Sequence, residues 1–194
     1  MAAVRDIFDF LDGLAAFDTQ MDFDNAGFLV GRSGRKVTHL LVSLDITEEV
    51  VEEAGALGAE LIVSHHPVIF HPVRSITDQD PVGRTLLAMV EKGISAICAH
   101  TNLDAAVGGV NDALAARLGL TDTVVLEPSG TDREGRPIGI GRAGIVADGV
   151  PTSTAEYASF VKKTLGANGV RYVDAGRPIH RVAVGGGACG DMGH

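Results

Sequence analysis

The chain has 194 residues, of which 45% are hydrophobic and 21% are charged, and this composition favours a folded globular protein over a disordered one. The formal net charge is −9 at pH 7 and the sequence has no basic run, so we expect no non-specific binding to nucleic acid and no membrane partner. The two cysteines, Cys98 and Cys189, form no Cys-x-x-Cys pair, which is typical of a reducing compartment.

The N-terminal residues 1–17 have the pattern of a helix of the folded protein, not of a signal peptide. They contain acidic residues and lack the apolar core of a signal peptide, and no stretch of the chain approaches the roughly 18 apolar residues of a membrane span. We therefore expect a cytoplasmic protein. Apolar side chains at helical spacing predict the first helix. They are Ile7, Phe8, Phe10, Leu11 and Leu14.

The segments that follow alternate between strand-like and helix-like patterns, after a turn and a short strand predicted within residues 23–31. Continuously apolar strands separated by amphipathic helices predict a parallel sheet with helices on both faces. In such sheets, functional sites form beyond the carboxyl ends of the strands. The predicted strands are residues 38–45, 59–64 and 94–104, and the predicted helices are residues 47–57, 80–93 and 108–120.

The pattern changes near Glu127, where we expect a second lobe. A polar loop and a glycine-rich strand are predicted within residues 127–146, followed by a helix and two further strands. The sequence therefore predicts a two-lobed α/β protein with a mainly parallel sheet, an N-terminal lobe at residues 1–126 and a second α/β lobe at residues 127–194 that is incomplete at its C-terminal end. The later helix is predicted at residues 152–166 and the two strands at residues 169–175 and 180–187.

Polar residues stand where the predicted parallel strands end. They are Asp45, the adjacent pair His65 and His66, and the segment 100–104. Imidazole is the commonest neutral ligand of zinc, iron and related metals, and the carboxylate of Asp104 would add an anionic oxygen. The alternative is that these are ordinary loop histidines without a ligand.

Adjacent side chains on a strand point to opposite faces, and Pro67 favours an extended conformation at His66. We therefore expect the two histidines to serve two ions, or one to bind an ion while the other supports it. His71 is interpreted as a turn residue, and His39 and His180 as structural or solvated residues away from the site. The glycine pattern of residues 139–144 predicts a closely packed strand, because no helix opens after it as a dinucleotide site requires.

Four segments, "DFDNAGFLVG", "ELIVSHHPVIF", "AHTNLDAAVGGVNDALAARLGL" and "RVAVGGGACGD", occur in this order along the chain. Together they resemble the family of GTP cyclohydrolase 1 type 2 homologues, also called the NGG-interacting-factor-three family. The resemblance covers nearly the whole chain. It implies a two-lobed α/β fold with a dinuclear metal site, often assembled into a ring-shaped hexamer, so a homo-oligomer is expected.

Carried over by position, the resemblance implies that His65, His66 and Asp104 bind divalent metal ions such as zinc, iron or manganese. It also implies that Asp24 and Asn25 belong to a structural motif and that Asn102 lies beside the ligands. In the family, a later stretch supplies a further histidine and glutamate, whereas this chain ends at "GDMGH". We therefore expect a shortened variant that holds at most one ion, weakly, and hydrolyses little GTP.

The resemblance implies a metal-dependent hydrolase that acts on a nucleotide such as GTP. The residues identify no general base, and no catalytic residue is assigned. A non-enzymatic metal-binding adaptor or regulatory protein is the alternative. A general two-metal phosphoesterase would require more acidic ligands than the sequence offers near the two histidines.

Overall fold

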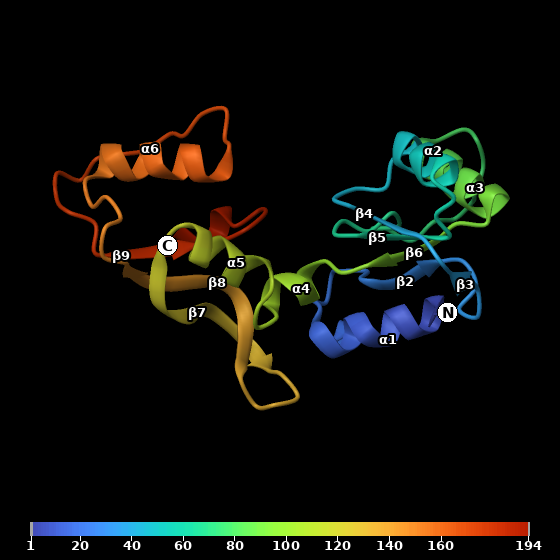
Figure 1. Cartoon of the computed structure of the whole chain (residues 1–194), viewed down its shortest axis with the longest axis horizontal. Coiled ribbons are helices and arrows are strands. Elements are labelled where there is room, and N and C mark those ends of the chain that lie inside the picture. The colour runs from blue at the N-terminus through green and yellow to red at the C-terminus, as the bar shows by residue number, and fades with distance from the viewer. Residues whose placement is uncertain (1, 194) are drawn as a thin grey trace. The chain divides into compact units, whose positions relative to one another are not determined.

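The structure is a computed structural model, and it describes residues 2–193 (Figure 1). The chain forms a mixed α/β fold and divides into two compact units, Met1–Leu103 and Asp104–His194. The division comes earlier than residue 127, where the change in sequence pattern placed it. The reason is that the strand β7 (Leu120–Thr131), which crosses residue 127, belongs wholly to the second unit.

The first unit is built on a four-stranded sheet. The order of its strands is β2 (Gly27–Val30), β6 (Ser95–Cys98), β5 (Leu61–Ser64) and β4 (Leu40–Ser43). The strands β4, β5 and β6 are parallel, as the sequence predicted, while β2 pairs with β6 in the antiparallel direction. The carboxyl ends of the three parallel strands therefore meet at one edge of the sheet.

Helices cover both faces of this sheet. Successive residues of β5, Leu61 and Ile62, are fully buried in two different hydrophobic clusters, because side chains alternate along a strand. The cluster around Leu61 includes residues of α1 (Val4–Leu14), and the cluster around Ile62 includes residues of α2 (Glu48–Ala56) and α3 (Pro81–Lys92). Figure 1 shows α1 on the opposite side of the sheet from α2 and α3.

Local interactions set the ends of α2 and α3. The Thr47 hydroxyl accepts a hydrogen bond from the backbone N–H of Val50 at 3.3 Å, and α2 begins there. The Asp80 carboxylate accepts from the backbone N–H of Gly83 at 2.9 Å at the start of α3. That helix ends at Gly93, whose φ of 65° lies in the left-handed region where glycine carries no steric penalty.

The second unit contains a three-stranded antiparallel sheet in the order β7, β8 (Pro137–Val146) and β9 (Arg181–Val184). Its longer helices are α5 (Val110–Arg117) and α6 (Thr154–Leu165). The predicted parallel arrangement is therefore found in the first unit, whereas the sheet of the second unit is antiparallel. The remaining short elements are β1 (Ala2–Ala3), η1 (Phe17–Thr19), β3 (Lys36–Val37), α4 (Thr101–Ala105) and η2 (Gly190–Gly193).

Three predicted segments differ from the structure. The strand predicted at residues 94–104 ends at Cys98, and α4 begins at Thr101. The loop predicted from Glu127 is instead the continuation of β7, which turns only where Asp132 accepts backbone hydrogen bonds at 2.8–3.0 Å. Residues 169–175 are not a strand; Val173 there is 92% exposed, so no buried face holds the segment in a sheet.

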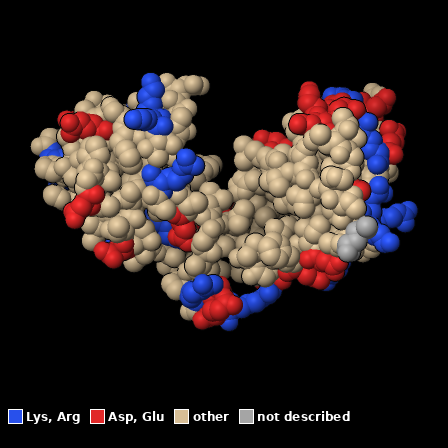
Figure 2. All heavy atoms as spheres, viewed as in Figure 1, with Lys and Arg blue, Asp and Glu red and all other residues tan. Residues whose placement is uncertain are grey.

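Acidic and basic side chains are interspersed on the face drawn in Figure 2, where no broad basic patch is visible among the described residues. This agrees with the net charge of −9. Among residues 2–193, none of the helices combines the length and the apolar character needed to cross a membrane.

Candidate metal centre

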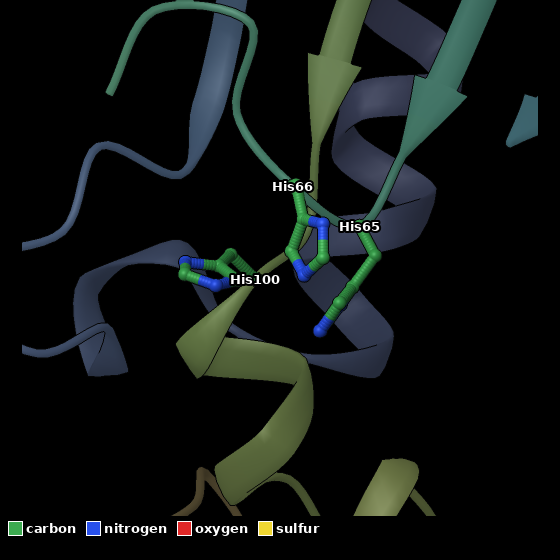
Figure 3. A group of neighbouring side chains, drawn as sticks. All are labelled: His65, His66 and His100. Atoms are coloured by element: carbon green, nitrogen blue, oxygen red, sulfur yellow. The ribbon is translucent and has the colours of Figure 1, made fainter. Parts of the chain in front are cut away.

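Three histidine rings meet beyond the carboxyl ends of β5 and β6 in the first unit (Figure 3). His65 and His66 follow β5, and His100 follows β6; we call these residues the histidine cluster. One ring nitrogen of each histidine lies within 4.8 Å of one ring nitrogen of each of the other two. The ring centroids are 5.1 Å apart for His65 and His66, 5.1 Å for His65 and His100, and 5.5 Å for His66 and His100. The cluster could therefore hold a metal ion.

The expectation that adjacent histidines point to opposite sides is wrong. The strand β5 ends at Ser64, so His65 and His66 lie in a bend where the alternation of a strand no longer applies. The Ser64 hydroxyl donates a hydrogen bond to the backbone carbonyl of His66 at 2.8 Å and tightens this bend. Both rings can consequently contribute to the same cluster.

His100 is the member of the cluster that was not predicted. The register of the sheet pairs Ser64 of β5 with Cys98 of β6, so His66 and His100 each stand two residues beyond a paired position. Counting residues from the ends of the two parallel strands would have identified His100. Asp104 lies in α4, four residues after His100, and is not one of the three grouped residues; its role as a ligand stays a prediction.

Carboxylates orient two of the three rings. The Nδ1 atom of His66 lies 2.7 Å from Oδ1 of Asp45, and the Nδ1 atom of His100 lies 2.8 Å from Oδ1 of Asp24. The sequence placed Asp45 at this edge of the sheet, and the contact with His66 confirms that position. The two pairs differ in solvent access, because the Asp45 side chain is 55% exposed and that of Asp24 is fully buried.

A backbone carbonyl orients the third ring. The Nδ1 atom of His65 lies 2.9 Å from the carbonyl oxygen of Ala99. A carbonyl or an ionised carboxylate can only accept, so Nδ1 donates in all three rings and a neutral ring then carries its lone pair on Nε2. The three contacts together select the tautomer that binds a metal through Nε2.

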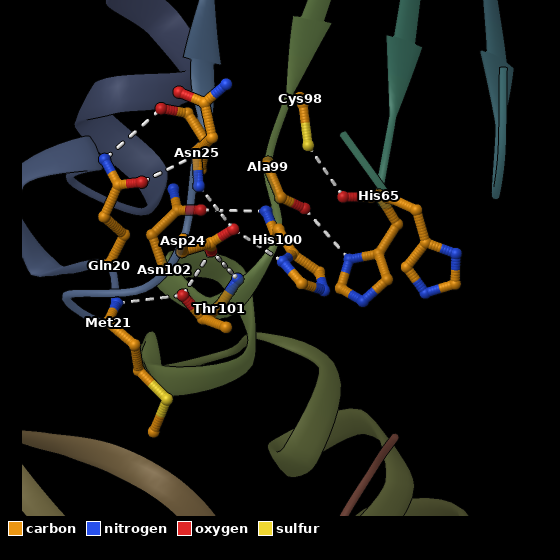
Figure 4. Close-up of polar contacts among 12 residues, drawn as sticks. Gln20, Met21, Asp24, Asn25, His65, Cys98, Ala99, His100, Thr101 and Asn102 are labelled. Atoms are coloured by element: carbon orange, nitrogen blue, oxygen red, sulfur yellow. Dashed lines mark hydrogen bonds and ion pairs between the residues drawn. The ribbon is translucent and has the colours of Figure 1, made fainter. Parts of the chain in front are cut away.

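Asp24 has a larger role than the structural motif suggested by the resemblance. Besides His100, its carboxylate accepts hydrogen bonds from the backbone N–H of Thr101 at 3.0 Å and from the Thr101 hydroxyl at 2.5 Å (Figure 4). Burial by itself would raise the pKa of the Asp24 carboxyl, but the hydrogen bonds from Thr101 and His100 hold that pKa below its ordinary value. Asp24 is therefore ionised near neutral pH and fixes the segment after β6.

Asn102 and Asn25 lock the surrounding loops. The fully buried Asn102 side chain accepts from the backbone N–H of His100 at 2.9 Å and donates to the carbonyl of Ala15 at 2.8 Å. This places Asn102 beside the histidine cluster, in agreement with the resemblance. The Asn25 side chain donates to the carbonyl of Ile69 at 2.6 Å and joins the loop before β2 to the loop after His66.

Cys98 supports the cluster without offering a thiolate. Its thiol donates a hydrogen bond to the carbonyl oxygen of His65 at 2.8 Å, and the side chain is fully buried. Burial, reinforced by the negative charge of Asp24, raises the pKa of Cys98 to about 12. A thiol in this state is a structural contact and offers no reactive thiolate.

The donor set of the cluster fits a divalent transition-metal ion. Imidazole nitrogens suit zinc and iron, and such ligands usually donate their second ring N–H to a carboxylate or carbonyl that fixes the ring. All three rings meet that condition through Asp45, Ala99 and Asp24. Three protein ligands are also the usual number at a catalytic zinc site, where a further coordination position stays open.

The comparisons with known proteins agree with the resemblance. The family model described as Duf34/NIF3 (NGG1p interacting factor 3) matches residues 2–194. A relative from Clostridium perfringens, named "GTP cyclohydrolase 1 type 2 homolog", is 34% identical over 93% of this chain and 68% of its own length. A relative of the same name from Lactococcus lactis is 34% identical over 87% of this chain and 63% of its own length. The matched region thus covers about two thirds of each of these relatives.

Solved structures share the fold. A hypothetical protein from Staphylococcus aureus is 28% identical with a TM-score of 0.86, and covers 95% of this chain and 72% of its own. Reduced HcgD from Methanocaldococcus jannaschii is 28% identical with a TM-score of 0.77, over 95% of this chain and 69% of its own. A Bacillus cereus protein related to NIF3 is 23% identical with a TM-score of 0.88, over 99% and 78%. The chain therefore belongs to the Duf34/NIF3 (NGG1p interacting factor 3) family.

Proposed function

We propose that this protein binds a divalent metal ion, such as zinc, iron or manganese, through the histidine cluster, and that it hydrolyses a nucleotide such as GTP. The observation that carries the proposal is the hydrogen bond that each ring makes through Nδ1, which leaves Nε2 in the form that binds metal. The nucleotide is taken from the name of the relatives. A bound divalent ion supplies Lewis acidity and makes water a stronger nucleophile near neutral pH.

The residues around the cluster have distinct roles in this proposal. Asp24 and Asp45 hold His100 and His66 in place, and their negative charges offset part of the charge of a divalent ion. A dinuclear site needs more ligands than three imidazoles. Asp104, which the resemblance implies as a ligand, remains a proposed metal ligand. Cytoplasmic location and homo-oligomeric assembly also remain proposals.

Turnover by metal-loaded protein tests the proposed activity. The purified 194-residue chain, loaded in turn with zinc, iron(II) and manganese, is assayed for hydrolysis of GTP and of a panel of phosphoesters. We expect the low GTP turnover of this chain to disappear in His100→Ala and to persist in His71→Ala, because His71 is an exposed histidine outside the cluster. Metal binding without turnover of any compound would reject the hydrolase and support the metal-binding adaptor.

A further inference from the structure

Phe70 lies beside the histidine cluster, Phe23 lies against Phe70, and both rings are open to solvent. Phe23 is 63% exposed and Phe70 is 38% exposed. Their centroids are 6.4 Å apart with an edge-to-face angle of 67°, and the Phe70 ring lies 6.2 Å from the His100 ring at 85°. The pair, which we call the aromatic pair, thus extends directly from the cluster to the surface.

The hydrogen bonds of the site hold the aromatic pair in position. Phe23 precedes Asp24 and Asn25, and Asp24 is bonded to the cluster through His100. Phe70 follows Ile69, whose carbonyl accepts the 2.6 Å hydrogen bond from the Asn25 side chain. Each ring therefore lies next to a residue that is hydrogen-bonded within the site, and the Phe70 ring also contacts the Phe23 and His100 rings.

Such an arrangement is suited to a planar ligand. Large aromatic side chains are usually buried. A flat ring that stacks on one of these two faces and meets the other ring edge-on would remove apolar surface from water. Stacking on an aromatic face tolerates different heteroaromatic rings because every base has a π-face. The aromatic pair lies next to the proposed reaction centre, so a ring bound there keeps the rest of the ligand near the cluster.

We propose that Phe23 and Phe70 bind the planar heteroaromatic ring, such as a purine base, of the molecule on which the histidine cluster acts. This inference rests on the proposed function because it takes the cluster as the reaction centre. The two are nevertheless separable, since stacking of a ring on the aromatic pair needs no turnover and can be measured with a nucleoside monophosphate.

The chain has no tryptophan, which allows a fluorescent reporter to be placed at a single position. Phe23→Trp keeps a stacking ring in the aromatic pair, and Phe10→Trp is the matched control because Phe10, in α1, is 65% exposed. Zinc-loaded protein is titrated with GMP, and with ribose 5-phosphate as a probe without the ring. We expect saturable quenching by GMP in Phe23→Trp only, and none by ribose 5-phosphate.

A second substitution tests the other ring. In the Phe23→Trp background, Phe70→Ala should weaken GMP binding roughly 5- to 150-fold, the range expected for loss of one base–aromatic contact. Phe70→Tyr should retain binding, and zinc content should match the parent in both variants. Circular dichroism confirms that each variant is folded before the titrations are compared.

The outcomes separate this inference from the proposed function. Equal quenching in Phe23→Trp and Phe10→Trp, or unchanged GMP affinity in Phe70→Ala, would overturn the aromatic pair as a ring-binding site. Zinc binding by the parent chain would still support the metal site in that case. Concentration-dependent self-association that Phe23→Ala abolishes would instead make the pair a protein contact and would also overturn the inference.

Discussion

Asp24 and Asp45 each accept a hydrogen bond from a histidine of the cluster, but only Asp24 is shielded from water. An exposed ion pair is screened and contributes little, whereas a buried carboxylate strongly fixes its partner. Asp24→Asn should therefore weaken zinc binding about 10- to 100-fold. Asp45→Asn should weaken zinc binding less, because the Asp45 side chain, which pairs with His66, is 55% exposed. Isothermal titration calorimetry gives both affinities.

The same titrations can contradict this ranking. A larger loss in Asp45→Asn than in Asp24→Asn would show that burial does not decide how strongly a carboxylate supports its histidine. Because Asp24 also accepts two hydrogen bonds from Thr101, unfolding by urea is measured in parallel. This separates a loss of affinity from a loss of folded protein.

The two thiols should differ in reactivity. Cys98 is fully buried and its pKa is raised to about 12, so almost no thiolate is present near neutral pH. Cys189 is only partly buried, although burial raises its pKa too. We expect a thiol reagent to label Cys189 first in the native protein and Cys98 only after denaturation. Mass spectrometry of the labelled peptides checks the order, and prompt labelling of native Cys98 would contradict it.

At the residue scale, the sequence predicted the cluster only in part. His65 and His66 could be predicted because two imidazoles stood together after a strongly apolar strand. His100 was missed because the strand predicted at residues 94–104 was too long. The chain instead turns after Cys98, where Asn102 and Asp24 accept backbone hydrogen bonds. Those contacts join residues 76 or 77 positions apart, or depend on a local side-chain turn, and hydrophobic periodicity carries no information about either.

At the element scale, a single carboxylate ties the start of β5 to the segment before β4. Glu60 accepts hydrogen bonds from the backbone N–H groups of Thr38 and His39, both at 3.0 Å, and from the Thr38 hydroxyl at 2.9 Å. The hydrogen bonds from His39 and Thr38 lower the pKa of Glu60 from its ordinary value of 4.5 to about 2.

A group whose pKa is lower in the folded protein than in the unfolded chain stabilises the folded protein at pH values above its unfolded-state pKa. The Glu60 contribution should therefore be complete above about pH 5 and should disappear as the pH falls from about 4.5 towards 2. In Glu60→Gln, the urea midpoint should be lower at neutral pH and should fall less steeply across this window. The exposed Glu53→Gln in α2 is the control, and an identical pH slope in both variants would contradict the assignment.

The elements were predicted well where the pattern was local. The stripe of α1, the Thr47 and Gly93 ends of the covering helices and the three parallel strands all depend on neighbouring residues. The extension of β7 could not be predicted in this way, since its polar second half is held by pairing with β8 rather than by its own apolar residues. Residues 169–175 show the converse, because a β-rich composition without a buried face forms no strand.

At the scale of the whole molecule, the two units depend on different interactions. The second unit contains Arg142, which is 3% exposed, pairs with Asp112 and donates to the backbone carbonyls of Gly139 and Gly141 at 2.8 Å. Removing one partner of a buried pair is strongly destabilising. Arg142→Ala should lower the free energy of unfolding of the second unit by about 3 kcal/mol.

Zinc binding should distinguish the units in this variant, because the histidine cluster lies wholly in the first. Hydrogen exchange should increase in β7, β8 and β9, while β4, β5 and β6 keep their protection and the affinity for zinc stays within about twofold. Equal loss of protection in both sheets would show that the chain unfolds as one cooperative body.

The fold of the first unit was within reach of the sequence because its three parallel strands and the two helices between them, α2 and α3, repeat one pattern. The helix predicted at residues 108–120 belongs instead to the second unit, as α5. The boundary between the units was not within reach, since a strand whose residues change in composition at Glu127 continues through that change. The hydrophobic pattern could not identify the family. The resemblance of the four sequence segments did, and the family model that matches residues 2–194 confirms it.

We expect the histidine cluster to bind a divalent metal ion through all three rings. Anomalous diffraction at the zinc absorption edge, from crystals of the zinc-loaded chain, tests it most directly. We predict a peak within about 2.0–2.1 Å of Nε2 of His65, His66 and His100. A zinc peak elsewhere, with the three rings still bonded through Nδ1 but coordinating nothing, would show that the histidine cluster is not the metal site.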